Sequence, residues 1–109
     1  MKVDELIGEL QKKDLSVIQS ETSKSGYISL ECVTNKGKNR KFLELPKNNN
    51  EDITWLKCHI DTILPAMDDT RPTKDGAPIN RQVYFDNKIG DEKIINIAVA
   101  SYNKVKNLY

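Results

Sequence analysis

GYISLECVTNKGKNRKFLEL, residues 26–45, is the stretch that decides the fold. Within it, ISLECV at 28–33 places Ile, Leu and Cys on one side of an extended chain and Ser and Glu on the other. This period of two is typical of a half-buried strand. The following NKGK at 35–38 contains a glycine that can adopt the positive φ of a tight reversal. A second apolar run follows at 42–45, so the stretch predicts a β-hairpin with a basic tip.

Upstream of this hairpin, the spacing of the apolar residues changes to that of a helix. Val3, Leu6, Ile7 and Leu10 stand at i, i+3, i+4 and i+7, which predicts a helix of about three turns. Asp14 is expected to begin the turn that leaves this helix. A weak alternation at 15–20, rich in β-branched residues, predicts a first strand.

Downstream of the hairpin, the spacing is again helical. Ile53, Leu56, Ile60 and Ile63 recur on one face, which predicts a second helix over 51–64 that docks on the sheet. An asparagine at 48–50 is expected to cap it, because its side-chain oxygen can accept a free backbone N–H.

The last third of the chain divides into three parts. Residues 65–80 contain three prolines and a glycine, which predicts a long irregular loop. Residues 82–85 predict a strand, and Asp91 is placed to cap a final helix. The stretch 92–108 is compatible with a strand, but its alanines and its long 3.6-residue period favour a helix.

The resulting element order, α-β-β-β-α-β-α, predicts an α+β fold. We expect a small antiparallel sheet of three to four strands packed against two or three helices. The length of 109 residues favours one domain, residues 1–109.

The composition bounds the class of protein. Lys plus Arg number 17 and Asp plus Glu number 16, which argues against a bulk polycation or a polyanion. The sequence has no long apolar run, so we expect no membrane partner and a cytoplasmic location. Cys32 and Cys58 are then expected to be reduced core thiols.

No pattern in the sequence favours catalysis, and we predict a non-enzymatic protein without a cofactor. His59 is the only histidine and has no evident nucleophile beside it. Cys58 and His59 lack the paired spacing of a zinc site, so no metal centre is predicted. Asp68, Asp69 and Asp75 could hold a divalent cation, but a solvated charged loop explains them more simply.

Two segments are candidate binding surfaces. Four cations at the hairpin tip and on its second strand could contact phosphates: Lys36, Lys38, Arg40 and Lys41. Tyr27 and Phe42 would add stacking if they face outward. Protection of an exposed strand edge is the structural alternative for this basic run.

The second candidate surface is the proline-rich loop. Its residues combine both charges with a methionine, and prolines lower the entropy lost when a loop is fixed by a partner. The predicted protein-binding residues are Met67, Asp68, Asp69, Arg71 and Lys74.

The first half of the chain, VDELIGELQKKDLSVIQS followed by SLECVTNKGKNRKFLEL, resembles small phage anti-CRISPR proteins that block the type II effector nuclease. The resemblance covers the N-terminal helix and the three-stranded meander only. The matching positions are Val3, Leu6, Ile7, Lys13, Asp14, Val17 and Asn35-Lys36-Gly37. It implies a phage-encoded inhibitor of a CRISPR effector complex, acting in the host cytoplasm. The DNA mimicry of that family is not carried over, because those proteins are strongly acidic and this hairpin is basic.

Three functional hypotheses follow, in order of preference. The first is a small intracellular interaction protein that blocks a host defence nucleoprotein complex. The second is a nucleic-acid-binding module that uses the basic hairpin. The third is an uncharacterised enzyme subunit. A similarity of α-β-β-β-α to the double-stranded-RNA-binding fold ranks lower, because acids at 51–52 occupy the position of its lysine-rich motif.

Overall fold

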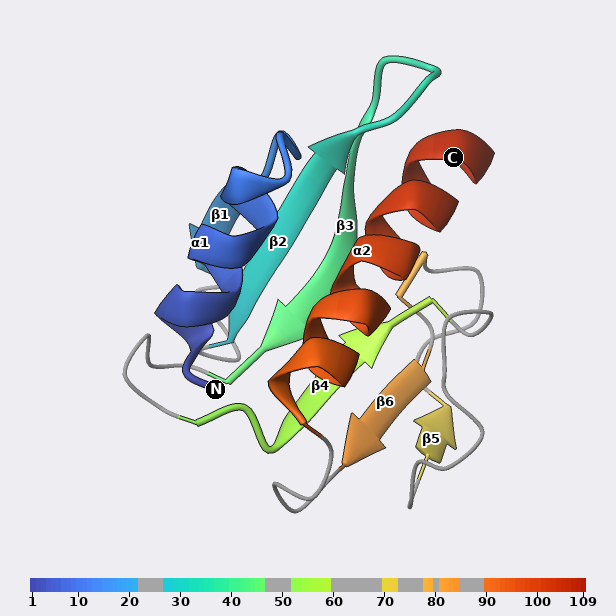
Figure 1. Ribbon diagram of the computed structural model, residues 1–109. Coiled ribbons are helices and arrows are strands. Elements are labelled where there is room, and N and C mark those ends of the chain that lie inside the picture. Colours follow the sequence, from blue (N-terminus) through green and yellow to red (C-terminus); the bar gives the residue numbers. More distant parts are fainter. Residues whose placement is uncertain (22–26, 47–51, 60–69, 73–77, 80, 85–89) are drawn as a thin grey trace.

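The computed structural model describes residues 1–21, 27–46, 52–59, 70–72, 78–79, 81–84 and 90–109. Two helices and six strands lie within these ranges (Figure 1). In chain order they are α1 Val3–Lys12, β1 Ile18–Glu21, β2 Ile28–Val33, β3 Asn39–Leu45, β4 Trp55–Cys58, β5 Thr70–Pro72, β6 Arg81–Tyr84 and α2 Asp91–Leu108.

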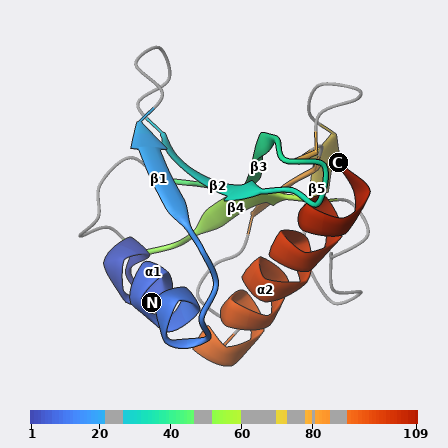
Figure 2. The same ribbon diagram turned by 90° about the horizontal axis from the view of Figure 1, so that it is seen from above.

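The strands form one antiparallel sheet in the order β1-β2-β3-β4-β6-β5. Both helices lie on the same side of this sheet (Figure 2). They run in the same direction, so their N-terminal ends share one end of the molecule (Figure 1). The α+β class is therefore confirmed, with more strands than the sequence predicted. Neither helix is long and apolar enough to span a bilayer, as far as the described residues show.

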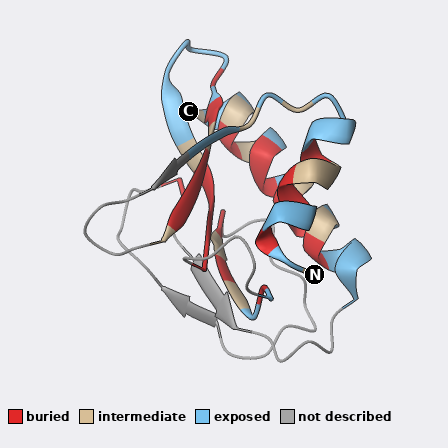
Figure 3. Cartoon of the chain, turned by 90° about the vertical axis from the view of Figure 1, so that its left-hand side faces the viewer, coloured by how far each residue is buried: buried red, intermediate tan, exposed pale blue. Residues whose placement is uncertain are grey.

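The core lies between the helices and the sheet, where the buried positions of both layers face one another (Figure 3). The predicted stripe of α1 is confirmed, since Val3, Leu6, Ile7 and Leu10 are all buried. Asp14 follows the helix with a φ of 59°, a left-handed conformation that Asp tolerates better than most side chains. The predicted turn at Asp14 is confirmed.

Gly8 lies inside α1, and no atom lies within 4 Å of the Cβ that a larger residue would place there. Gly8→Ala is therefore expected to raise the free energy of unfolding by about 0.5–1 kcal/mol, because alanine loses less backbone entropy on folding. Urea denaturation followed by circular dichroism measures this change. A destabilised variant would show that the helix packs against something at this position.

The predicted helix over 51–64 is wrong where the structure describes this stretch. Residues 55–58 form strand β4, in which Leu56 and Cys58 are fully buried while Trp55 and Lys57 are half-buried. β4 is paired on both sides, with β3 and with β6. Because β4 has a neighbour on each side, its backbone N–H and C=O groups find hydrogen-bond partners. Trp55 and Cys58 also suit a pleated, partly buried surface. The expected cap at 48–50 and the residues at 60–64 lie outside the described residues.

The hairpin of β2 and β3 is confirmed and contains a β-bulge. Leu30 pairs with Leu43 and Glu31 pairs with Lys41, so Phe42 has no pairing partner. Both Phe42 and Leu43 are fully buried, although neighbouring residues of a regular strand would point to opposite faces. The bulge thus explains how two consecutive large apolar residues both enter the core.

The helix interpretation of 92–108 is confirmed, because α2 spans Asp91–Leu108. Gly90 is its N-cap residue, so Asp91 belongs to the first turn and is not the cap that the sequence predicted. The buried stripe of α2 includes Ile97, while Leu108 at the end of the helix is 52% exposed.

The strand predicted at 82–85 is confirmed as β6, shifted by one residue. The irregular loop predicted over 65–80 is wrong in part. Thr70–Pro72 forms β5, which pairs with β6 at the edge of the sheet, where a proline is tolerated.

Candidate functional site

The tip of the β2–β3 hairpin is a closed turn held by Thr34. The Thr34 N–H donates to the Lys38 carbonyl (2.8 Å), and the Gly37 N–H donates to the Thr34 carbonyl (2.8 Å). The Thr34 hydroxyl also accepts a bond from the Lys38 N–H (3.2 Å). Gly37 has a φ of 78°, the left-handed conformation that glycine adopts without a steric penalty. These bonds fix the backbone that carries the cations of the tip.

The tip is joined to the last turn of α2, a contact between distant parts of the chain. The Asn35 N–H donates to the Lys106 carbonyl (2.9 Å), and the Asn35 side-chain amide donates to the Asn107 Oδ1 (2.9 Å). The last carbonyls of a helix have no partner within the helix, so the hairpin satisfies one of them. Lys106 thereby lies beside the tip and near β2, where its charge acts on Cys32.

We call this end of the molecule the basic end, consisting of Lys36, Lys38, Arg40 and Lys106. The three hairpin cations are exposed, and no ion pair joins them to any described residue. Lys106 is half-buried, with its Nζ 6.0 Å from the centroid of the Tyr102 ring. The tip of the hairpin extends beyond the end of α2 (Figure 1), so its charges face solvent.

Acidic residues gather at the opposite end, where both helices begin. The first turn of α1 carries Asp4 and Glu5, and that of α2 carries Asp91 and Glu92. Carboxylates are stabilised there by the positive end of the helix dipole.

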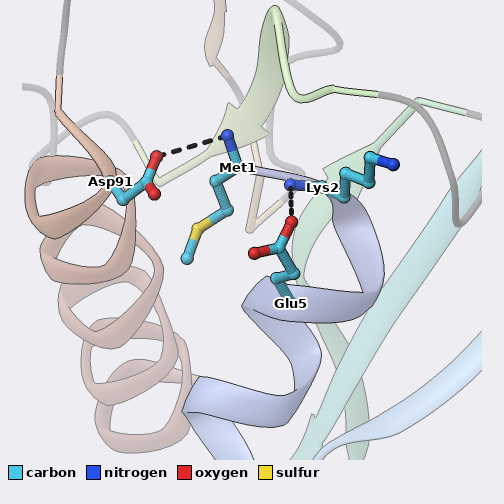
Figure 4. Close-up of polar contacts among 4 residues, drawn as sticks. All are labelled: Met1, Lys2, Glu5 and Asp91. Atoms are coloured by element: carbon cyan, nitrogen blue, oxygen red, sulfur yellow. Dashed lines mark hydrogen bonds and ion pairs between the residues drawn. The ribbon is translucent and has the colours of Figure 1, made fainter.

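The N-terminal residues connect the first turns of α1 and α2 through polar contacts (Figure 4). The Met1 ammonium pairs with Asp91 (3.2 Å), and the Lys2 N–H donates to the Glu5 carboxylate (3.1 Å). Among the described residues, the first-turn carboxylates of both helices thus lie at the end opposite the hairpin cations.

The face of the sheet that carries no helix, here called the outer face, holds Tyr27, Ser29, Lys41, Glu44, Trp55 and Lys57. Glu44 is buried between two lysines: Lys57 Nζ lies 3.2 Å from one carboxylate oxygen and Lys41 Nζ lies 4.0 Å from the other. The sequence grouped Lys41 with the hairpin cations, but Lys41 differs from them because its charge is paired with Glu44 on the outer face.

Aromatic rings occupy the outer face next to this ion-pair group. The Tyr27 and Trp55 rings meet edge to face, with centroids 4.9 Å apart and planes at 73°. Lys57 Nζ lies 5.5 Å from the centroid of the Tyr27 ring. Both aromatic residues are half-buried, so the pair is partly open to solvent. Phe42 does not contribute, because it is fully buried and packs edge to face on Tyr102.

A row of paired residues that crosses β2, β3 and β4 on the outer face is polar as well. Ser29 pairs with Glu44 and Glu44 pairs with Lys57 in the strand register. The Ser29 Oγ is buried and has no hydrogen-bond partner among the described residues. A buried hydroxyl without a partner costs about 1–3 kcal/mol, so this face carries polar groups that packing alone does not favour.

The two cysteines, which the sequence predicted to be core thiols, are buried. Cys32 and Cys58 are buried free thiols, as predicted. Burial raises the pKa of the Cys32 thiol, with partial opposition from the Lys106 charge, so this thiol stays protonated at neutral pH.

His59 is 5% exposed, and its backbone N–H donates a hydrogen bond to the Ser101 Oγ (3.1 Å). Among the described residues, no three His, Cys, Asp or Glu side chains come close enough to hold a metal ion.

The predicted protein-binding loop lies mostly outside the described residues. This applies to Met67, Asp68, Asp69 and Lys74. Arg71 belongs to β5, where its backbone pairs with Gln82.

No family model, no curated protein and no solved structure matches this chain. The resemblance to anti-CRISPR proteins therefore stays a prediction drawn from residues 1–45.

Sequence reasoning found the hairpin cations but missed Lys106 and the role of Asn35. The signal was present in part, because Lys104 and Lys106 close a strongly periodic helix. The pairing of that helix end with the hairpin depends on contacts between residues about seventy positions apart, which no local pattern encodes.

Proposed function

We propose that this protein is a non-enzymatic nucleic-acid-binding module whose basic end contacts phosphates. The observation that carries the proposal is the gathering of four cations at one end, with the three exposed ones free of ion pairs to described residues. Cations placed this way can exchange bound counterions for phosphates, which is the main source of sequence-independent affinity.

The geometry of the tip supports this function in two further ways. The turn is held by three hydrogen bonds at Thr34 and by the contacts of Asn35 with α2. A preorganised tip loses little backbone entropy when it binds. The tip also extends beyond the helix, so a phosphate backbone can approach it without contacting the acidic end (Figure 1).

A protein partner was the leading hypothesis from the sequence, in the form of an inhibitor of a CRISPR effector complex. The residues proposed for it lie mostly outside the described part of the chain, and the support for the second hypothesis comes from the exposed cations of the hairpin. We propose a cytoplasmic location in either case, because the free thiols Cys32 and Cys58 remain reduced there.

The proposed function predicts that affinity for nucleic acid depends on salt through the hairpin cations. Replacing Lys36, Lys38 and Arg40 together by Gln is expected to lower the slope of log affinity against log salt by about 2 for single strands and about 3 for duplex DNA. Each lost phosphate contact removes about 0.7 or 0.9 from that slope. Fluorescence anisotropy with labelled DNA and RNA between about 50 and 200 mM salt measures it.

The matched control replaces Lys2, Lys12 and Lys93 by Gln. All three are exposed lysines away from the hairpin tip, so this variant loses the same charge while keeping the basic end. Its slope is expected to stay unchanged. If the native protein binds neither DNA nor RNA near 50 mM salt, the proposal fails, and a protein with an acidic surface becomes the partner to seek by pull-down from a bacterial lysate.

A further inference from the structure

The outer face has a chemistry that the basic end lacks. Its two lysines are paired with a carboxylate, since Lys41 and Lys57 flank Glu44, and Glu31 pairs with Lys41 in the strand register. The described charges of this face, on β2, β3 and β4, therefore nearly cancel, whereas the three exposed hairpin cations have no such partners among the described residues. A nearly neutral surface does not attract phosphates strongly, but it can accept nucleobases, which are uncharged.

The aromatic pair provides rings on which nucleobases can stack. Every base has a π-face, so partly exposed aromatic side chains on a sheet can stack on bases without sequence preference. Tyr27 and Trp55 hold each other at a fixed angle through their edge-to-face contact, and Lys57 lies over the Tyr27 ring. Fixed rings lose little side-chain entropy when a base stacks on them.

The two surfaces are linked by a single strand of the sheet. β2 begins next to Tyr27 and leads to the turn that carries Lys36 and Lys38. Six residues of extended chain span ~20 Å at ~3.3 Å per residue. A single-stranded nucleic acid of a few nucleotides covers this distance, within the range of site sizes known for sheet surfaces that bind single strands, about four nucleotides or more.

We infer that the outer face binds the unstacked bases of a single-stranded nucleic acid whose phosphates contact the basic end. This inference rests on the proposed function and adds the substrate class, single strand in preference to duplex. In a duplex the bases are stacked and paired, so they cannot reach Tyr27 or Trp55.

Trp55 is the only tryptophan in the chain, so its fluorescence reports on this face alone. Titration with an unlabelled oligonucleotide of thymidines or uridines, about ten nucleotides long, is expected to quench Trp55 emission and to protect it from acrylamide. A duplex of the same length is expected to bind the basic end while leaving the emission and its acrylamide quenching unchanged.

Tyr27→Leu tests the stacking contribution. It is expected to weaken binding of the single strand by about 5- to 150-fold, the range for loss of one stacked base, and to leave duplex binding unchanged. The control is Tyr109→Leu, which removes a half-buried tyrosine from the helix side of the molecule, where its ring contacts His59. Circular dichroism checks the fold of both variants.

Two outcomes separate this inference from the proposed function. Salt-dependent binding to single strands without quenching or protection of Trp55 in the native protein overturns the inference and leaves the proposed function in place. Binding to no nucleic acid at all overturns both. The acrylamide measurement uses the native protein, so it decides the matter even if Tyr27→Leu does not fold.

Discussion

Phe42→Ala is expected to lower the free energy of unfolding by about 3–5 kcal/mol, the range for removing a buried phenylalanine. Phe42 is fully buried at the β-bulge, and its ring packs edge to face on Tyr102, with centroids 5.1 Å apart. The truncation leaves a cavity between β3 and α2, and it also removes the favourable contact between the two rings. Urea denaturation followed by circular dichroism measures the loss.

Val33→Ala is the control for this experiment. Val33 belongs to the same hairpin but is 46% exposed, so its truncation is expected to change stability by no more than about 0.5 kcal/mol. A similar small effect for Phe42→Ala would mean that the bulge relaxes to fill the space, and that Phe42 is not a fixed part of the core.

Ser101→Ala is expected to destabilise the protein by about 2–4 kcal/mol, although it removes a single oxygen atom. The Ser101 hydroxyl donates to the Phe42 carbonyl and accepts a hydrogen bond from the His59 backbone N–H (3.1 Å). Ser101 is fully buried, so the variant removes two hydrogen bonds from buried backbone groups, and each loss costs about 1–3 kcal/mol.

Asn103→Ala on the exposed side of α2 is the control, since it changes the same helix without touching the sheet. Equal stabilities of the Ser101→Ala and Asn103→Ala variants in thermal and urea denaturation would contradict this role of Ser101. A water molecule in place of the hydroxyl would then have to satisfy both backbone groups.

The elements that the sequence predicted well are those whose periodicity has one interpretation. In α1 the stripe of Val3, Leu6, Ile7 and Leu10 fits only a period of 3.6, and in β2 the alternation fits only a period of two. Both elements form as expected because local pattern and tertiary packing agree.

The stretch around β4 shows why the remainder was not predictable. Ile53 and Leu56 are three apart and suit one face of a helix, but Leu56 and Cys58 are two apart and suit one face of a strand. Both interpretations bury Leu56, and the choice is made by pairing with β3 and β6, which come from distant parts of the chain. Tertiary context of this kind overrides local spacing.

The candidate site was predictable to the same extent. A run of cations at Lys36, Lys38 and Arg40 is visible in the sequence, but the addition of Lys106 and the removal of Lys41 depend on the packing of α2 and on the ion pair with Glu44. The proposed stacking surface depends on Trp55 being in a strand, so it could not follow from a helical interpretation of that segment.

The parallel arrangement of the two helices has a consequence for how the protein meets a partner in solution. Among the described residues, the carboxylates of the two helix starts lie at one end and the hairpin cations lie at the other, although the net charge is only +1. Under the proposed function, a polyanion attracts the hairpin cations and repels the carboxylates at the helix starts, which favours an approach with the hairpin forward. Encounters are thereby oriented, and the rate of productive collision rises without the indiscriminate attraction that a high overall positive charge would bring.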